Sequence, residues 1–495
     1  MDVKFEIIKK DVLGRVGHLK TKHGIIETPM ILPVINPNNI VIPPEDMKNI
    51  GAEAIITNSY IIYSNQRLRD RAREEGLHRM LNFDRPIMTD SGSFQLSVYG
   101  DINVDNMEIL QFQNEIGSDI CVPLDIPTKP NERYDEAEKD VTITINRLRE
   151  ISNIKHIFKD NIIVAPIQGS TYRDLRRKNA IEASKLDFDL YAIGAIVPLL
   201  EEYRYDDIVD VVIASKLNIP LNKPVHLFGA GHPMGFAIFV LMGCDLFDSA
   251  SYILYAMDKR YLTVNGTYKL SNLRYFQCNC PVCSKYTPEE VRGLENEDIV
   301  RLLAIHNLYE SFTEIKRIKQ SIMDGRLWEL VQIRCASHPK LLNGLRRLVK
   351  YSNNLERYDV SSKSAFFYGG AESNRRTEVI RYRKKLRNMP IKMTPALITT
   401  IPSIEDIKDY KSVYYLKPPF GPYPLELSET YPLNFESPEI LDKEMVRTAL
   451  LNLIVFLNND KNKGKDVTFE YDKRYRDPLI KKIKKMVDVR LINEI

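Results

Sequence analysis

The sequence predicts an α/β protein built on a (β/α)8 barrel, and three observations support this prediction. Eight short apolar runs occur within the first half of the chain. Amphipathic stretches with helical spacing separate most of them, as is typical of parallel strands connected by helices. Polar or glycine residues follow nearly every run, as at the active-site end of such barrels. An open doubly wound sheet is the alternative, but no glycine-rich phosphate turn follows the first run.

The predicted strands are apolar runs of strand length, and eight of them in about 250 residues favour a closed TIM-like barrel. They are Pro29–Ile35, Ala54–Asn58, Pro86–Thr89, Ile120–Leu124, Ile162–Gln168, Asp189–Ala195, Pro224–Gly229 and Cys244–Phe247. The clearest helical patterns between them are Asn106–Ile116, Asp135–Ile151 and Tyr172–Leu186.

The composition is that of a globular protein, with 44% hydrophobic and 27% charged residues. The chain contains no run of eighteen apolar residues, so a membrane span is not expected. The first ten residues also lack the apolar stretch of a signal peptide. These features together predict a cytoplasmic protein.

Three of the six cysteines lie within six positions, in the pattern Cys278-x-Cys280-x2-Cys283. His306 follows after twenty-two residues, within a helical pattern. Three thiolates and one imidazole suit tetrahedral zinc, and four protein ligands leave no open position, which predicts a structural ion. A set of buried free cysteines is the alternative, and the spacing supports His306 less strongly than the cysteines.

The length and the charge distribution predict further domains after the barrel. We expect the barrel, including a zinc subdomain at about 265–340, to occupy residues 1–345, and smaller α+β domains to occupy 346–430 and 431–495. Residues 341–392 carry thirteen Lys or Arg against four Asp or Glu, and residues 461–495 carry eleven against six. Such asymmetry favours a polyanionic partner, although a solvated charged surface explains it equally well.

Three aspartates stand at the carboxyl ends of predicted strands. Asp90 opens Asp-Ser-Gly-Ser-Phe-Gln after one strand, Asp125 ends a second, and Asp248 follows a third. In a barrel these ends meet on one rim. Two carboxylates there can divide the roles of nucleophile and general acid/base at a glycosidic carbon. Helix capping and divalent-metal binding are alternatives that the spacing leaves open.

Two further strand ends offer groups suited to a purine-like base. The amide of Gln168 presents both a donor and an acceptor. Gly194, followed by Ala195, permits close approach of a ligand to the backbone. Each signal is weak alone, since glycine after a strand is ordinary turn chemistry.

Taken together, these motifs resemble the tRNA-guanine transglycosylases, and the likeness covers nearly the whole chain. It is carried by Asp90–Gln95, Leu246–Ala250, the cluster of Cys278, Cys280, Cys283 and His306, Tyr191–Ala195 and Gly229–Pro233. The archaeal branch is indicated by Arg326–Leu330, Phe366–Gly369 and Pro419–Pro432.

The resemblance implies exchange of guanine at position 15 of the tRNA D-loop for 7-cyano-7-deazaguanine, a step towards archaeosine. It implies one structural zinc ion per chain. Asp248 would attack the ribose and displace guanine, and Asp90 would act as general acid/base. Because the nucleophile role is also assigned to Asp90 in the family, both are predicted as catalytic. The implied substrate-binding residues are Ser91, Phe94, Asp125, Gln168, Gly194 and Ala195.

The resemblance also implies partners: tRNA, the deazaguanine, guanine as leaving base and a second copy in a homodimer. Many archaeal members end in a PUA domain, and this chain ends too early for one, so a separate PUA-type protein is a possible partner. A basic stretch is expected to contact phosphates; it comprises Arg375, Arg376, Arg381, Arg383, Lys384 and Lys385.

Two alternative functions remain at this point. One is a non-catalytic, tRNA-binding accessory relative, against which the retention of Asp90, Asp125 and Asp248 argues. The other is a barrel metallohydrolase that uses the carboxylates to hold a divalent metal.

Overall fold

The computed structural model describes residues 4–93, 105–158, 160–401 and 408–492. The chain forms two compact units. The first comprises Met1–Met323 with Ile333–Arg347, and the second comprises Asp324–Gln332 with Leu348–Ile495.

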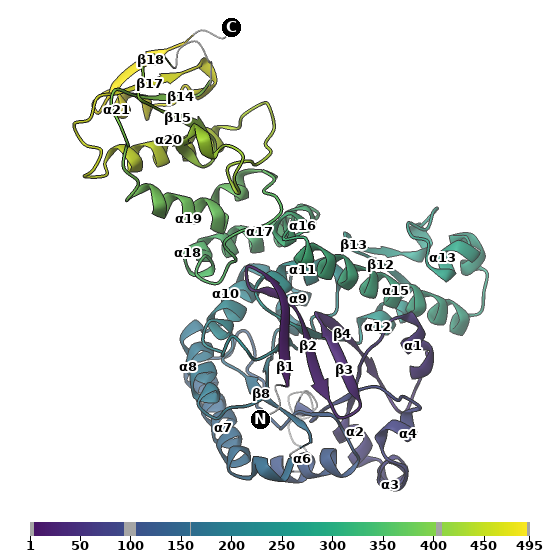
Figure 1. Cartoon of the computed structure of the whole chain (residues 1–495). Coiled ribbons are helices and arrows are strands. Elements are labelled where there is room, and N and C mark those ends of the chain that lie inside the picture. Colours follow the sequence, from purple (N-terminus) through teal and green to yellow (C-terminus); the bar gives the residue numbers. More distant parts are fainter. Residues whose placement is uncertain (1–3, 94–104, 159, 402–407, 493–495) are drawn as a thin grey trace. The chain divides into compact units, whose positions relative to one another are not determined.

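The first unit is a closed barrel of eight parallel strands in the order β10-β11-β4-β5-β6-β7-β8-β9 (Figure 1). The barrel confirms the predicted fold class. Its strands are short and mostly buried, as expected when helices cover the outside of a parallel sheet. They are β4 (Met30–Ile35), β5 (Ile55–Asn58), β6 (Ile87–Asp90), β7 (Ile120–Cys121), β8 (Ile162–Ile167), β9 (Leu190–Ile193), β10 (Val225–Leu227) and β11 (Leu246–Ser249).

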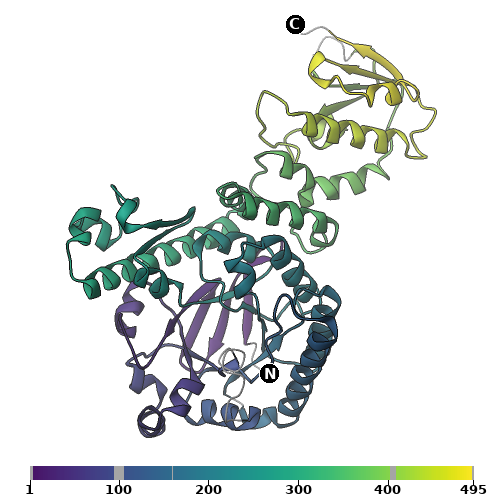
Figure 2. The same ribbon diagram turned by 180° about the vertical axis from the view of Figure 1, so that it is seen from behind.

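Helices surround the barrel, as the view from behind shows (Figure 2). The longest of them, α7 (Tyr134–Ile154), buries Val141, Ile145 and Leu148, which lie three or four positions apart on one face. The others are α1 (Pro44–Ile50), α2 (Ser59–Ser64), α3 (Gln66–Glu75), α4 (Leu77–Leu81), α6 (Asn106–Glu115), α8 (Arg173–Ser184), α9 (Val197–Glu201), α10 (Tyr205–Lys216), α11 (Pro233–Leu241) and α12 (Ser251–Met257).

An antiparallel sheet precedes the barrel, and the sequence patterns did not predict it. It consists of β1 (Phe5–Asp11), β2 (Gly14–Thr21) and β3 (Gly24–Thr28). Polar contacts tie it to residues that immediately precede barrel strands. Lys4 contacts Asp189 at 3.0 Å and Arg15 contacts Asp245 at 2.7 Å. The sheet therefore packs at the amino-terminal end of the barrel, away from the strand tips.

Asp119, directly before β7, binds the turn between β2 and β3 of this sheet. Its carboxylate accepts the backbone N–H of His23 at 3.0 Å and that of Ile87 at 2.9 Å. It also contacts the imidazole nitrogens of His23 at 2.8 Å and His78 at 3.0 Å. The three side chains lie close enough together to hold a metal ion. The Asp119 carboxylate already accepts four N–H groups, and these hydrogen bonds explain why the three side chains lie together. They anchor the turn between β2 and β3.

The first unit continues into the cysteine-rich segment and a long helix. A hairpin of β12 (Arg260–Thr263) and β13 (Gly266–Lys269) comes first. It is followed by α13 (Pro281–Lys285), α14 (Pro288–Arg292) and α15 (Asn296–Met323). The chain then forms α16 (Leu327–Cys335), whose residues up to Gln332 belong to the second unit, and α17 (Pro339–Leu348).

The second unit contains a five-stranded mixed sheet in the order β16-β15-β14-β17-β18. The strands are β14 (Ala396–Thr399), β15 (Ser412–Lys417), β16 (Gly421–Pro424), β17 (Val467–Tyr471) and β18 (Asp488–Leu491). Its helices are α18 (Ser352–Leu355), α19 (Thr377–Leu386), α20 (Lys443–Leu457) and α21 (Ile480–Ile483). One hydrophobic core spans Phe366 to Ile483, so both ranges expected as small α+β domains contribute to the same sheet and core.

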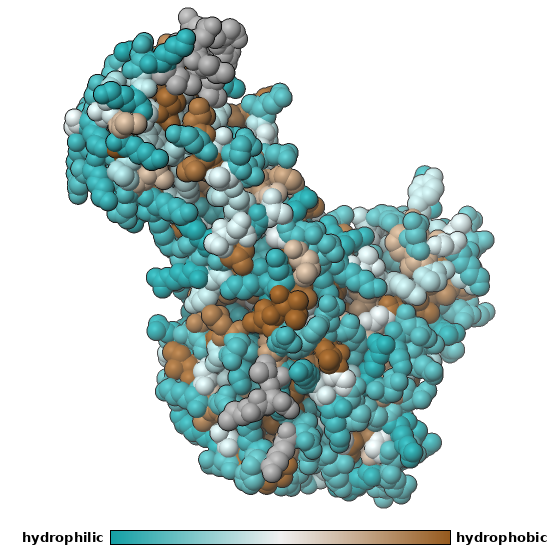
Figure 3. Space-filling view, viewed as in Figure 1, coloured by the Kyte–Doolittle hydropathy of each residue, from teal (hydrophilic) through white to brown (hydrophobic). Residues whose placement is uncertain are grey.

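The visible surface is mainly hydrophilic (Figure 3). No helix in the described part of the chain is both long and apolar enough to cross a membrane.

Candidate active site and candidate metal centre

The barrel places the three predicted aspartates at the carboxyl ends of its strands. Asp90 is the last residue of β6, Asp248 is the second-last residue of β11, and Asp125 follows β7. They are close enough to interact electrostatically. Burial, together with the negative charges of Asp125 and Asp248, raises the pKa of Asp90 to about 7. Asp90 can therefore both give and take a proton near neutral pH.

Asn58, at the end of β5, orients Asp90. It is paired with Asp90 in the register of the two strands, and its Nδ2 donates to Asp90 Oδ2 at 2.9 Å. The Oδ1 of Asn58 accepts the Ile61 N–H as the cap of α2, so the amide cannot turn freely. The sequence marked Asn58 as a strand end but gave no reason to assign it to the site.

Asp248 is held by two N–H donors. The backbone N–H of Gly229 and the Nε2 of His226 contact Asp248 Oδ1 at 2.8 and 2.9 Å. His226 lies in β10 and is fully buried. Both donors contact the same oxygen, and neither contacts Oδ2. Sequence reasoning missed His226, because a histidine inside an apolar strand carries no signal of its own until the neighbouring strand is known.

Asp125 and Gln168 form a buried pair. Gln168 Nε2 donates to Asp125 Oδ2, and Gln168 Oε1 accepts the Thr128 hydroxyl at 3.2 Å. The amide of Gln168 is thereby fixed between two partners. Burial raises the pKa of Asp125, while hydrogen bonds from Ser93 and Gln168 oppose that shift. One hydrogen of the Gln168 amide remains for another acceptor.

Four predicted base-pocket residues remain: Ser91, Gly194, Ala195 and Phe94. Ser91 is buried, and its hydroxyl contacts the Pro123 carbonyl at 3.2 Å and Ser93 at 3.0 Å. A Cβ atom on Gly194 would come within 2.4 Å of Gln168 Nε2, so a larger residue there would displace the Gln168 amide. Ala195 has a left-handed φ of 58°. Phe94 lies outside the described residues.

The four predicted metal ligands come together in the cysteine-rich segment. The Sγ atoms of Cys278, Cys280 and Cys283 lie 3.3, 3.6 and 3.4 Å from Nδ1 of His306. Zinc bonded tetrahedrally to sulfur and nitrogen at ordinary lengths separates the two atoms by about 3.5 Å. The donor set and its spacing therefore fit a zinc ion.

The surroundings of His306 also suit metal binding. Its Nε2 contacts the Leu262 carbonyl at 2.9 Å, which places the proton on Nε2 and leaves the lone pair of Nδ1 facing the sulfurs. The ring of Tyr261 stacks on the imidazole at 3.6 Å between centroids. These contacts from β12 fix the orientation of the ring and the ligand nitrogen.

The three barrel carboxylates are arranged differently from the cysteine cluster. Among the described residues, their oxygens do not form a group within 4.8 Å of one another, the spacing that marks the cysteine cluster. Their spacing therefore does not indicate a metal ion held by all three carboxylates together.

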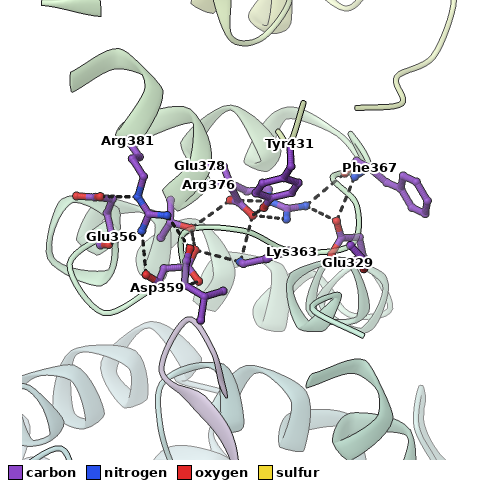
Figure 4. A network of polar contacts seen from close by, with 12 residues as sticks. Glu329, Glu356, Asp359, Lys363, Phe367, Arg376, Glu378, Arg381 and Tyr431 are labelled. Atoms are coloured by element: carbon purple, nitrogen blue, oxygen red, sulfur yellow. Dashed lines mark hydrogen bonds and ion pairs between the residues drawn. The ribbon is translucent and has the colours of Figure 1, made fainter. Parts of the chain in front are cut away.

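The structure corrects the expectation that the whole basic stretch of residues 375–385 contacts phosphates. Arg376 is fully buried in the second unit, where its guanidinium donates to Glu378 at 2.7 Å and to Glu329 (Figure 4). Arg381 binds Glu356 at 2.8 Å and backbone carbonyls of the same segment. Both arginines hold the fold together. Arg375, Lys384 and Lys385 are exposed.

Comparison with known proteins is consistent with this site. A family profile described as queuine tRNA-ribosyltransferase matches residues 11–340. A tRNA-guanine(15) transglycosylase of Methanosarcina barkeri is 51% identical over 98% of this chain and 97% of its own length. One of Archaeoglobus fulgidus is 48% identical over 93% and 94%. One of Methanocaldococcus jannaschii is 48% identical over 89% of this chain and 69% of its own length.

Proposed function

The chain belongs to the queuine tRNA-ribosyltransferase family, and from this we propose that it is a tRNA-guanine(15) transglycosylase. It exchanges guanine at position 15 of the tRNA D-loop for 7-cyano-7-deazaguanine, a step towards archaeosine. The observation that carries the proposal is the pair of differently held carboxylates on one rim. Asp248 is fixed by two N–H donors, and Asp90 has a pKa of about 7.

The exchange proceeds by two displacements at the ribose C1′. Asp248 attacks C1′ through a carboxylate oxygen, the glycosidic bond breaks, and an ester to the ribose forms. Protonated Asp90 gives its proton to the departing guanine. The incoming base then loses its N9 proton to Asp90, and N9 attacks C1′ and expels Asp248. One bond is broken and an equivalent one made in each half, so no nucleotide cofactor is needed.

Asp125, Gln168, Ser91 and the Gly194–Ala195 peptide are proposed to form the base pocket, with Phe94 stacking on the base. A carboxylate such as that of Asp125 accepts the two adjacent N–H groups on the amidine edge of guanine. The target base must leave its stacked position in the RNA to reach these groups.

The cysteine cluster is proposed to hold one structural zinc ion per chain. Cys278, Cys280, Cys283 and His306 fill all four positions of a tetrahedral site. Such an ion supplies no open coordination position for catalysis, so its contribution is to the fold of residues 260–310.

Several partners belong to the same proposal. The exposed residues Arg375 and Lys385 are proposed to contact tRNA phosphates, with salt-dependent affinity, whereas the exposed Lys384 pairs with Glu356. A homodimer, a separate PUA-type RNA-binding protein and a cytoplasmic location remain predictions from the family resemblance.

The pKa of Asp90 predicts opposite pH dependences for the two halves of the reaction. Release of guanine needs protonated Asp90, so its single-turnover rate should fall as the pH rises through about 7. Capture of the incoming base needs the carboxylate and should become faster over the same range. Rapid-quench measurements on both sides of pH 7 check this. Asp90→Asn should lower both rates about 100-fold or more and remove the inflection; an inflection that persists in this variant would assign it to another group.

His226 is expected to affect the rate of attack rather than the binding of tRNA. His226→Phe removes one of two donors to Asp248 Oδ1, so kcat should fall about 10- to 100-fold with the KM for tRNA unchanged. His226→Gln, whose amide nitrogen reaches a similar position, should restore part of the rate. Equal losses in both variants would indicate a packing role instead.

Mass spectrometry can test which base the protein incorporates and at which position of the tRNA. Unmodified tRNA is incubated with the protein and 7-cyano-7-deazaguanine, digested, and the oligonucleotide containing position 15 is analysed. We expect the deazaguanine at this position alone and no reaction with a tRNA carrying adenine there. Incorporation elsewhere in the tRNA, or none, would overturn the proposed specificity.

A further inference from the structure

Arg176 is a fully buried arginine in α8, directly beneath the proposed base pocket. Its guanidinium donates to three backbone carbonyls: Nη1 to Ile167 at 2.8 Å and to Gly194 at 3.0 Å, and Nε to Ser170 at 2.9 Å. Within the described part of the chain it forms no ion pair with a carboxylate. The contacts of this buried arginine therefore indicate a structural role, in which its side chain fixes the conformation of the backbone segments that it binds.

The three carbonyls belong to two neighbouring segments that carry pocket residues. Ile167 ends β8 and is followed by Gln168 and Ser170, and Gly194 follows β9, the adjacent strand. Both segments contain left-handed backbone, with φ of 50° at Ser170 and 58° at Ala195. Non-glycine residues adopt this region only when the surroundings hold them there.

Asn179, three positions after Arg176 on the same face of α8, supports one of these segments. Its Oδ1 accepts the backbone N–H of Gln168 at 2.7 Å. One face of α8 therefore binds both a backbone N–H and a backbone carbonyl of the loop after β8.

We propose that Arg176 is a positioning residue of the base pocket, which holds Gln168 and the Gly194–Ala195 peptide in the conformation that accepts the purine. This inference rests on the proposed function. The peptide bond is planar and trans, so with the Gly194 carbonyl bonded to Arg176, the Ala195 N–H points away from Arg176. Rotation of this peptide would remove that N–H from a base bound beside Gln168 and Asp125.

The chemistry of the side chain fits this role. A guanidinium is planar, carries five N–H donors and spans carbonyls on two segments, whereas an ammonium group is a compact point donor. Burial lowers the pKa of Arg176 to about 9, opposed by the negative charge of Asp125, so the group stays charged at neutral pH. Its charge also offsets that of Asp125.

The test compares Arg176→Met and Arg176→Lys with Lys216→Met. Lys216 is the control, because it is a fully buried basic residue in the same barrel whose Nζ has no hydrogen-bond partner among the described residues. Steady-state guanine exchange gives KM for the free base and kcat. Hydrogen–deuterium exchange of the folded proteins reports on residues 167–171 and 193–197. A variant that fails to fold is replaced in the comparison by the other Arg176 variant.

Both Arg176 variants should raise KM for the base about tenfold or more, with a smaller change in kcat, and should speed amide exchange in these two segments. Lys216→Met should do neither. Wild-type KM and wild-type amide exchange in the Arg176 variants would overturn the inference, as would equal effects in Lys216→Met. If the wild-type protein exchanges no guanine, the proposed function fails, and the amide exchange alone decides whether Arg176 holds the two segments.

Discussion

Replacing Asp248 by asparagine is expected to lower guanine exchange by at least about a thousandfold. An amide cannot form the ester with the ribose, so the first displacement cannot take place. Binding of tRNA should be unchanged, because asparagine keeps the shape of the side chain. The measurement is the rate of labelled guanine incorporation, together with a denaturing gel that detects the covalent tRNA–protein adduct.

Asp90→Asn is the matched variant for this experiment. It removes the proton donor but leaves the nucleophile, so a slow adduct is still expected, whereas Asp248→Asn should give none. The reverse result, with adduct in Asp248→Asn and none in Asp90→Asn, would make Asp90 the nucleophile and exchange the two roles.

Loss of the zinc site is the second large effect that we expect. Structural zinc binds with an apparent free energy of about 10–16 kcal/mol, which contributes directly to folding. Cys280→Ser should therefore abolish zinc binding, unfold the region around β12, α13 and the start of α15, and lower the thermal midpoint. Metal analysis, thermal unfolding and hydrogen–deuterium exchange of residues 260–310 measure these changes.

Cys244→Ala is the control, since Cys244 is buried in the barrel outside the cluster. It should keep one zinc ion per chain and normal protection of residues 260–310. A fully folded, zinc-free Cys280→Ser protein with wild-type exchange of amide protons would show that the cluster is a set of free thiols. Loss of activity alone would not distinguish these outcomes.

The barrel could be predicted because its strands are buried on both faces and end in polar residues, which leaves apolar runs of strand length in the sequence. The N-terminal sheet could not. Ile7 and Ile8 of β1 are exposed although apolar, and Lys4 and Arg15 contact the barrel through ion pairs although charged. Neither helical nor alternating periodicity results from such a surface.

The candidate site was predictable where one residue at a strand tip is informative by itself. Asp90, Asp125 and Asp248 are of this kind, as are the cysteines with their close spacing. His226 and Arg176 act through residues on neighbouring strands, so their roles depend on strand register and helix placement rather than on local pattern. Their contacts could be identified only from the three-dimensional structure.

The density of basic residues along the sequence did not predict which of them remain without acidic partners. Arg376 and Arg381 belong to the most basic stretch, yet acidic residues distant in sequence, Glu329 and Glu356, neutralise them inside the second unit. A run of basic residues does not show which of them find partners on folding.

The most direct test of the central claim is guanine exchange. The purified, zinc-loaded protein is incubated with unmodified archaeal tRNA and radiolabelled guanine, and label entering the RNA is followed over time, with Asp248→Ala as the control. We predict incorporation by the wild-type protein, none by the variant, and none into tRNA lacking guanine at position 15. A folded, zinc-loaded wild-type protein that incorporates no label would contradict the assignment of transglycosylase activity to this chain.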